Sequence, residues 1–244
     1  MTAIKTDKLT KKYGTKTAVD SLDLEIGKGE LFGLLGVNGA GKTTTIKMLS
    51  CLVSPTSGDA EVCGHSIVHE PSAVKRLNGV SPQETAVAPN LTVRENLELM
   101  CGINGMPVKE QHERADRMIA DFSLEEIADS RAKILSGGWC RRLSIAMAIV
   151  TDPDLIFLDE PTLGLDAIAR RELWKHIAGI KGKKTIILTT HYLEEAEALC
   201  DRIAIMVGGR IAALGTADEI KRLAGKDDFE EAFIKIAGEG RADR

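Results

Sequence analysis

The sequence predicts an α/β fold with a mainly parallel sheet, and three patterns carry that prediction. Fully apolar runs at residues 31–35 and 155–158 have the length and composition of strands that are buried on both faces. A glycine-rich segment follows the first run and two acidic residues follow the second, at the strand ends where parallel sheets carry functional residues. A charge-rich stretch of helical periodicity, at roughly residues 85–135, interrupts this alternation, and we interpret it as an insertion into the α/β core.

Composition narrows the class of protein. The chain has 244 residues, of which 43% are hydrophobic and 28% charged, as expected for a soluble protein of one or two domains with a large core. A net charge of −4 and a pI near 5.8 argue against a broad basic face for nucleic acid. The five cysteines are scattered and odd in number, which predicts free thiols in a reducing compartment.

Membrane-directed segments are not expected from this sequence. Its first residues lack the apolar segment of a signal peptide, and no uninterrupted apolar run reaches the roughly eighteen residues that span a bilayer. If the protein acts on a membrane, we expect another chain to supply the span.

The first elements are expected to be short strands at residues 3–7 and 18–26, separated by a loop that carries Tyr13. An aromatic side chain on such a loop can stack on an adenine ring, and a half-buried loop tyrosine is the simpler alternative.

Residues 36–44 carry the strongest motif. They read G-V-N-G-A-G-K-T-T, which fits the phosphate-binding pattern G-x-x-x-x-G-K-[ST] between an expected strand and an expected helix at residues 44–49. The glycines allow successive backbone N–H groups to point at phosphate oxygens, next to the positive end of the helix. Lys42 would then reach the β and γ phosphates, and the Thr43 hydroxyl would bind Mg²⁺.

The next segment is expected to contain a turn at residues 54–59, a strand at 60–63 and another strand at 78–82 that ends before Gln83. Cys63, His65 and His69 lie close together in sequence but fit no zinc spacing, and we predict no metal site there. A helix is expected to begin at Thr92, which forms its cap together with Glu95 three residues later. Further helices are expected at residues 106–122 and at 124–128.

Ser136, Gly137 and Gly138 open a further helix, where they form either a second phosphate cradle or a simple helix cap. The strand at residues 155–158 ends in Asp159 and Glu160. We interpret Asp159 as a Mg²⁺ ligand and Glu160 as the general base for an attacking water, with strand alternation keeping the two side chains apart; two surface acids are the alternative.

His191 follows another buried strand, at residues 184–188, and either contacts a γ-phosphate or serves as a capping or core histidine. Later elements are expected to be a helix at residues 192–199, strands at 203–207 and 210–213, and a charged terminal helix with a frayed end within 225–244.

Taken together, these motifs resemble those of the nucleotide-binding subunits of ATP-binding cassette transporters over roughly residues 3–222. The phosphate loop, Gln83, the signature at residues 135–138, the Walker B strand at 155–159 with Glu160, the D-loop at 164–166 and His191 occur in the family's order. The resemblance implies a phosphate-loop NTPase core of the RecA type with an N-terminal antiparallel β-subdomain. The implied boundaries are 1–84 and 145–222 for the core with its β-subdomain, 85–144 for an inserted helical subdomain, and 223–244 for a C-terminal helical tail.

The resemblance also implies a mechanism that needs two cassettes paired head to tail, with ATP and Mg²⁺ held between them. It assigns catalytic roles to Glu160, His191 and Gln83, and Mg²⁺ ligation to Thr43, Gln83 and Asp159. The residues that it places around ATP are Tyr13, Gly36, Asn38, Gly39, Ala40, Gly41, Lys42, Thr43 and Thr44, and from the second cassette Ser136, Gly137, Gly138 and Asp166.

The stretch Glu194–Ala204, with Gly209-Arg210 and Leu214–Thr216, is most similar to the drug-resistance, sodium-efflux and polysaccharide-export branch. This similarity implies a prokaryotic exporter ATPase on the cytoplasmic side of the cell membrane, with a separate transmembrane permease, a second cassette that is expected to be identical, and no nucleic-acid partner. The alternatives are a soluble cassette ATPase acting on ribosomes or nucleic acid and a regulatory cassette that only binds ATP.

Three residues depart from the family pattern. Trp139 stands where the family usually has glutamine or methionine, and Cys140 stands where a basic or polar residue is common. Met147 replaces the arginine that is usual on the same helix. The Trp139 indole could strengthen or obstruct closure of a dimer, and we expect closure to survive because Ser136 and the glycines are intact.

Overall fold

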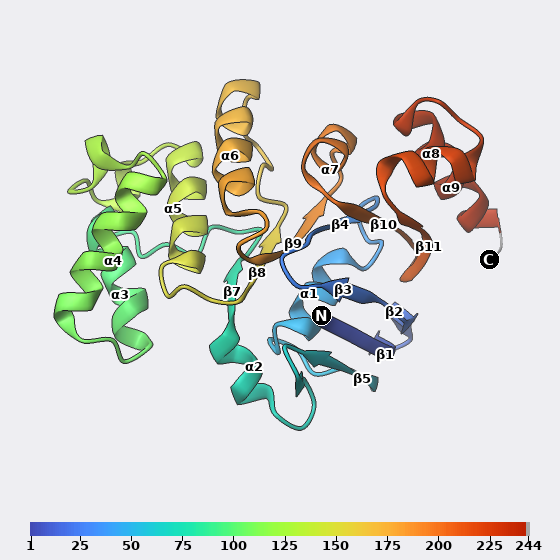
Figure 1. Ribbon diagram of the computed structural model, residues 1–244, viewed down its shortest axis with the longest axis horizontal. Coiled ribbons are helices and arrows are strands. Elements are labelled where there is room, and N and C mark those ends of the chain that lie inside the picture. The colour runs from blue at the N-terminus through green and yellow to red at the C-terminus, as the bar shows by residue number, and fades with distance from the viewer. Residues whose placement is uncertain (243–244) are drawn as a thin grey trace.

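The computed structural model describes residues 1–242, which form two sheets and the helices around them (Figure 1). The larger sheet has the strand order β11-β10-β4-β9-β8-β7. The smaller sheet has the order β2-β1-β5-β6, with β3 also paired to β1. Helix α1 lies between the two sheets, the α3–α5 group lies at one end of the molecule, and α8 and α9 lie at the other.

The larger sheet is parallel except at one edge, as predicted. Its strands are β4 (Leu31–Leu35), β7 (Asn78–Ser81), β8 (Leu155–Asp159), β9 (Thr185–Thr190), β10 (Arg202–Val207) and β11 (Arg210–Gly215), and only the β10–β11 pair is antiparallel. Every residue of β4, β8 and β9 is buried. Their apolar runs form strands because helices or the second sheet cover both faces.

The smaller sheet is antiparallel, also as predicted, but its strands begin and end elsewhere than expected. They are β1 (Thr2–Tyr13), β2 (Lys16–Leu22), β3 (Glu25–Gly27), β5 (Ser57–Val62) and β6 (His65–Ser66). Strand β1 continues to Tyr13 through two register shifts against β2, so the predicted loop at Tyr13 is wrong. The expected strand at 18–26 is interrupted after Leu22, and the last part of the expected turn at 54–59 belongs to β5.

The charge-rich stretch forms α3 (Val93–Ile103) and α4 (Val108–Asp121), and the segment after it adds α5 (Gly137–Ile149) to this helical group. Thr92 and Glu95 make the predicted capping box, in which each side chain accepts the other residue's backbone N–H. The third helix expected at 124–128 is only a 3₁₀ turn at Glu125–Ile127.

The remaining helices connect strands or cover the sheet. They are α1 (Lys42–Leu49), α2 (Pro71–Leu77), α6 (Ala167–Ile180), α7 (Leu193–Leu199), α8 (Ala217–Ala224) and α9 (Phe229–Ala242). Helix α2 was not predicted, although a proline at its first position is a recognised start signal. The last two residues of the expected frayed end lie outside the described part of the chain. Among residues 1–242, no helix combines the length and the apolar character that crossing a bilayer requires.

One close packing contact fixes the strand that leads to Gln83. At Gly79 on β7, an added Cβ would lie 1.8 Å from the Ala148 carbonyl oxygen of α5. Strand β7 and helix α5 therefore approach backbone to backbone, which only glycine allows.

We therefore expect Gly79→Ala to lower the free energy of unfolding by about 1–3 kcal/mol, because the added methyl group forces β7 and α5 apart. Urea denaturation of the purified chain measures the change. Gly179→Ala in α6 is the control: a Cβ there meets no atom within 4 Å, so helix propensity should make that variant equal to or more stable than the wild type. Equal unfolding midpoints for the two variants would contradict this expectation.

Candidate functional site

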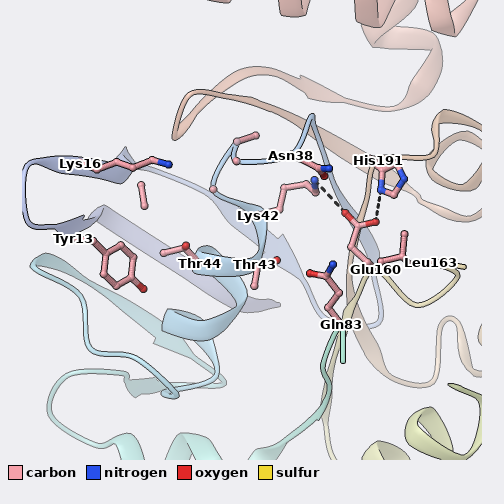
Figure 2. A pocket seen from close by; sticks show the side chains of 14 residues that line it. Tyr13, Lys16, Asn38, Lys42, Thr43, Thr44, Gln83, Glu160, Leu163 and His191 are labelled. Atoms are coloured by element: carbon pink, nitrogen blue, oxygen red, sulfur yellow. Dashed lines mark hydrogen bonds and ion pairs between the residues drawn. The ribbon is translucent and has the colours of Figure 1, made fainter. Parts of the chain in front are cut away.

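A cavity of about 520 Å³ lies where the phosphate loop meets the carboxyl ends of β8 and β9 (Figure 2). The parallel registers bring these ends together, since Leu35 pairs with Thr190 and Asp159 pairs with Thr189. The residues that line the cavity are Tyr13, Lys16, Ala18, Asn38, Gly39, Ala40, Gly41, Lys42, Thr43, Thr44, Gln83, Glu160, Leu163 and His191.

The phosphate loop takes the curled backbone that its glycines predicted. Gly41 caps α1 with a φ of 109°, which side-chain-bearing residues rarely adopt, and Gly36 lies so close to β10 that a Cβ would sit 2.5 Å from the Met206 carbonyl oxygen. Helix α1 begins directly after this loop. The unpaired N–H groups of its first turn and the positive end of the helix dipole therefore face the cavity.

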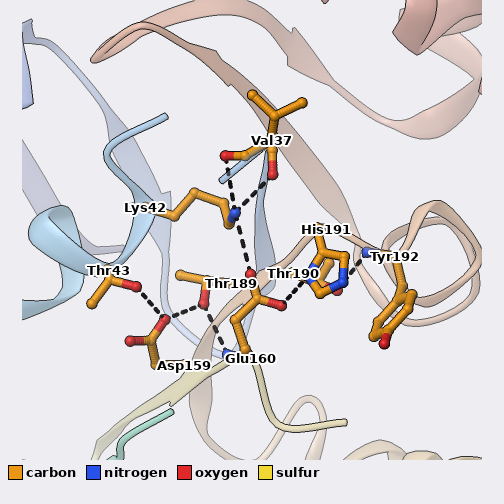
Figure 3. Close-up of polar contacts among 10 residues, drawn as sticks. Val37, Lys42, Thr43, Asp159, Glu160, Thr189, Thr190, His191 and Tyr192 are labelled. Carbon is orange, nitrogen blue, oxygen red and sulfur yellow. Dashed lines mark hydrogen bonds and ion pairs between the residues drawn. The ribbon is translucent and has the colours of Figure 1, made fainter. Parts of the chain in front are cut away.

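Lys42 is 5% exposed, and its ammonium group is held inside the loop (Figure 3). It donates to the carbonyl oxygens of Gly36 at 2.7 Å and Val37 at 3.4 Å, and it lies 3.2 Å from Glu160 Oε1. A buried cation is thus surrounded by three oxygen acceptors, and an incoming phosphate oxygen would substitute for one of them.

Asp159 is 3% exposed and accepts two hydroxyl hydrogen bonds on Oδ1. Thr43 Oγ1 donates at 2.9 Å and Thr189 Oγ1 donates at 2.5 Å (Figure 3). The carboxylate of Asp159, the hydroxyl of Thr43 and the side-chain amide of Gln83 are oxygen donors of the kind that Mg²⁺ prefers, so this set fits the ion chemically.

Glu160 lies just beyond β8, and its backbone explains why it points away from Asp159. Its φ of 50° is in the left-handed region, so the separation of the two carboxylates comes from this turn and not from the strand alternation that we predicted. The Glu160 N–H donates to both oxygens of Thr189, at 3.1 Å to the carbonyl and 3.0 Å to Oγ1. A strained turn held by buried hydrogen bonds is a common feature of functional sites.

His191 pairs with the second oxygen of Glu160. Its Nδ1 lies 2.7 Å from Glu160 Oε2, and its ring centroid lies 4.2 Å from that of Tyr192. One carboxylate therefore bridges Lys42 and His191, two residues that were predicted separately from different motifs.

Gln83 lines the cavity as predicted, and sequence reasoning missed the residue that holds its backbone. Arg141 in α5 is 5% exposed and donates to the carbonyl oxygens of Pro82, at 2.8 Å, and of Gln83. Burial lowers the pKa of Arg141, and the charge of Asp159 opposes that shift. The signal in the sequence was weak, because Arg141 and Arg142 are two adjacent basic residues just before the apolar part of this helix.

Tyr13 lies at the far edge of the cavity, about half exposed, with the Lys11 ammonium group 5.2 Å from its ring centroid (Figure 2). An exposed ring beside the phosphate loop is available for stacking on a base.

The residues expected to act from a second cassette lie outside this cavity. Ser136 caps α5, accepting from the Trp139 N–H at 3.4 Å, and Asp166 caps α6, accepting from the Ile168 and Ala169 N–H groups at 2.9 Å each. The capping interpretation of Ser136 is therefore correct within one chain.

The three residues that depart from the family pattern all lie on α5 and make contacts there. The Trp139 ring is half-buried and lies 4.5 Å beneath the Arg142 guanidinium group, which also pairs with Glu172 on α6 at 2.5 Å. Met147 is buried in the core, and the Cys140 thiol faces the Ala132 carbonyl oxygen at 3.7 Å.

This fold and site define a phosphate-loop ATPase. The sequence pattern of the family described as "ABC transporter" matches residues 19–163, and the chain belongs to that family. It is 43% identical to a daunorubicin resistance ATP-binding protein of Streptomyces coeruleorubidus, over 98% of this chain and 75% of that protein.

Two further comparisons agree. The chain is 44% identical to the Nod factor export ATP-binding protein I of Paraburkholderia xenovorans, over 87% of this chain and 70% of that protein. It is also similar, with a TM-score of 0.80 and 27% identity, to the structure of a dimeric ATP-binding cassette in a post-hydrolysis state bound to ADP and Pi, over 87% of this chain and 98% of the other.

We expect Arg141→Met to lower the free energy of unfolding by about 1–3 kcal/mol, because two buried carbonyl oxygens lose charged donors. Urea denaturation measures the loss. The neighbouring variant Arg142→Met is the control, since it removes a partly exposed ion pair and should cost less than about 1 kcal/mol. Equal losses in the two variants would show that Arg141 does not hold the Gln83 segment.

Proposed function

We propose that this chain is the ATP-hydrolysing subunit of a prokaryotic exporter and works from the cytoplasmic side of the membrane through a separate membrane-spanning permease. The observation that carries the proposal is the convergence of Lys42, Glu160 and His191 beside the Asp159–Thr43 pair in one cavity. The names of the drug-resistance and export relatives support the direction of transport.

In this proposal ATP lies along the cavity from Tyr13 to His191. Tyr13 stacks on adenine, and the N–H groups of residues 36–44 bind the phosphates together with Thr44. Lys42 exchanges part of its present contact with Glu160 for β- and γ-phosphate oxygens. That exchange frees Glu160 Oε1, so nucleotide binding itself prepares the carboxylate for chemistry.

Glu160 then takes a proton from the attacking water, and His191 holds the carboxylate in place through Oε2 and donates to the γ-phosphate. Gln83 orients the water from the part of the cavity wall next to Glu160. The turn at Glu160 and the two hydrogen bonds from its N–H fix the base, which limits the reorganisation needed in the transition state.

Thr43, Asp159 and Gln83 would hold Mg²⁺, which when bound neutralises charge on the β and γ phosphates. Thr189 already orients the Asp159 carboxylate by donating to Oδ1, a supporting contact of the type that fixes metal ligands.

A second cassette, expected to be a copy of this chain, completes the site by supplying Ser136, Gly137, Gly138 and Asp166. These residues lie at the start of α5 and just before α6, where helix N-termini favour anions. The dimeric state of the ADP-bound relative supports such a pairing.

We propose the domain boundaries that the resemblance to the family implies. Residues 1–84 and 145–222 form the nucleotide-binding core with its β-subdomain, residues 85–144 form the helical subdomain, and residues 223–244 form a C-terminal tail. Helices α3, α4 and α5 share one hydrophobic cluster with β8, β9 and α6, and α8 and α9 share another with β10 and β11, so both parts pack directly on the core. Because the signature leads directly into α5, which contains Arg141, movement at Gln83 would reach the signature through one helix.

We expect Glu160→Gln to slow ATP hydrolysis by about 10²–10⁴, because a general base contributes on that order, while ATP affinity stays within about twofold. Phosphate release and binding of a fluorescent ATP analogue measure the two quantities. ATP with Mg²⁺ should also hold this variant as a dimer in light scattering. Glu197→Gln, an exposed change on α7, is the control for turnover.

Unchanged turnover in Glu160→Gln would move the catalytic role elsewhere. A Glu160→Gln chain that stays monomeric with saturating ATP and Mg²⁺, while Glu160→Gln/Trp139→Gln dimerises, would show that the Trp139 indole blocks closure.

We expect a tagged chain, recovered from detergent-solubilised membranes of its source cells, to carry a polytopic membrane protein in equal amount. Mass spectrometry identifies the partner, and an unrelated tagged cytoplasmic protein is the control. Recovery only of ribosomes or nucleic acid would favour the soluble ATPase alternative.

A further inference from the structure

A buried carboxyl group that the proposed chemistry does not use lies behind the Glu160–His191 pair. Glu195 is on α7, four residues after His191, and it is fully buried. The Trp174 Nε1–H of α6 donates to Glu195 Oε1 at 3.0 Å. Among residues 1–242, Glu195 forms no ion pair, which is unusual for an acidic side chain that is completely removed from water.

The second carboxyl oxygen of Glu195 lacks a hydrogen-bond partner of regular geometry within the described residues, and so does the hydroxyl of Thr162. Both atoms, Glu195 Oε2 and Thr162 Oγ1, are buried. The hydroxyls of Thr162 and Thr190 lie close enough to lower the pKa of the Glu195 carboxyl group, and Thr190 Oγ1 already accepts the Tyr192 N–H at 2.9 Å. A neutral acid can donate from Oε2 to Thr162 Oγ1, and it avoids an unpaired charge at a position that is fully removed from water.

The charges around Glu195 favour its neutral form. Burial raises the pKa of Glu195, and the negative charge of Glu160 adds to that shift, while the hydroxyls of Thr190 and Thr162 and the Trp174 indole oppose it. Two other ionisable groups lie nearby. The Arg170 guanidinium of α6 lies over the Tyr192 ring at 4.6 Å, and the half-buried Cys200, whose thiol pKa is raised by burial and in part by the charge of Glu195, lies at the end of α7.

The segments that meet at Glu195 are those that hold the proposed catalytic pair. Thr162 is in the loop that directly follows Glu160, and Thr190 directly precedes His191. Leu163 of the same loop donates its N–H to the Glu160 carbonyl oxygen at 3.1 Å and lines the cavity. A small shift in this loop would therefore displace Glu160 relative to His191.

We propose that Glu195 is a positioning residue of the ATPase site, whose neutral carboxylic acid accepts from Trp174 and donates to Thr162 and so fixes the loop after Glu160 against the segment of His191. This inference rests on the proposed roles of Glu160 and His191.

Two substitutions at Glu195 separate hydrogen bonding from charge. Glu195→Gln keeps one acceptor and one donor without a charge, so kcat should stay within about twofold of the wild type. Glu195→Leu removes both at similar volume and should lower kcat about tenfold with ATP affinity unchanged, because small misplacements of reacting groups cost rate. Phosphate release and nucleotide binding by the purified full-length chain measure both, and Glu194→Leu, an exposed change on the same helix, is the control.

The pH dependence of stability gives a second readout that loss of packing alone would not move. A raised pKa in the folded chain means that wild-type stability from Glu195 is full below the ordinary glutamate pKa of 4.5 and is lost as the pH rises toward the folded value. The Tm of wild type relative to Glu195→Gln should therefore fall as the pH is raised from about 5 to about 8.

If Glu195→Leu does not fold, Thr162→Val tests the same contact. It removes only the hydroxyl and should lower kcat about threefold at normal Tm and ATP affinity. An unchanged kcat in Glu195→Leu or Thr162→Val, or an equal loss in the Gln and Leu variants, overturns the proposal. A wild-type chain that hydrolyses no ATP, or a Glu160→Gln chain with full turnover, would instead overturn the proposed function.

Discussion

The structure depends on the parallel pairing of β4, β8 and β9, which ends all three strands at one edge of the sheet. This single constraint brings together residues from three distant parts of the sequence: Lys42 after β4, Glu160 after β8 and His191 after β9. Because the three strands are buried on both faces, their register cannot slip without exposing apolar side chains. Core packing therefore sets the geometry of the site.

The sequence predicted those parts of the molecule in which local patterns and global fold agree. The phosphate loop, the three buried strands and the Thr92 capping box each have a short-range signal that tertiary contacts reinforce. The smaller sheet was predicted less well, because β1 continues to Tyr13 through register shifts that no local pattern encodes. Strand ends in that sheet are set by partner strands and not by composition.

The cavity lining was largely predicted from motifs, and the buried polar residues behind it were not. Arg141 and Glu195 are ordinary members of helical segments in the sequence, and their roles depend on contacts with residues 59 and 21 positions away. The alternation of side chains along β8 likewise predicted that Asp159 and Glu160 point apart. They do, but the positive φ of Glu160 produces the separation. Long-range polar contacts and single backbone turns have no periodic signature.

These buried polar residues link the catalytic edge to the elements that must move. Arg141 joins the Gln83 segment to the helix that follows the signature, and Glu195, through the Thr162 contact that we propose, would join the Glu160 loop to α6, which Asp166 caps. In a low-dielectric interior such hydrogen bonds are strong when they are complete and costly when they are broken, so each linked pair of segments tends to move together. In the two-chain site that we propose, a change at the phosphates would have to reach both the helical group and the dimer face, as discrete shifts of whole elements.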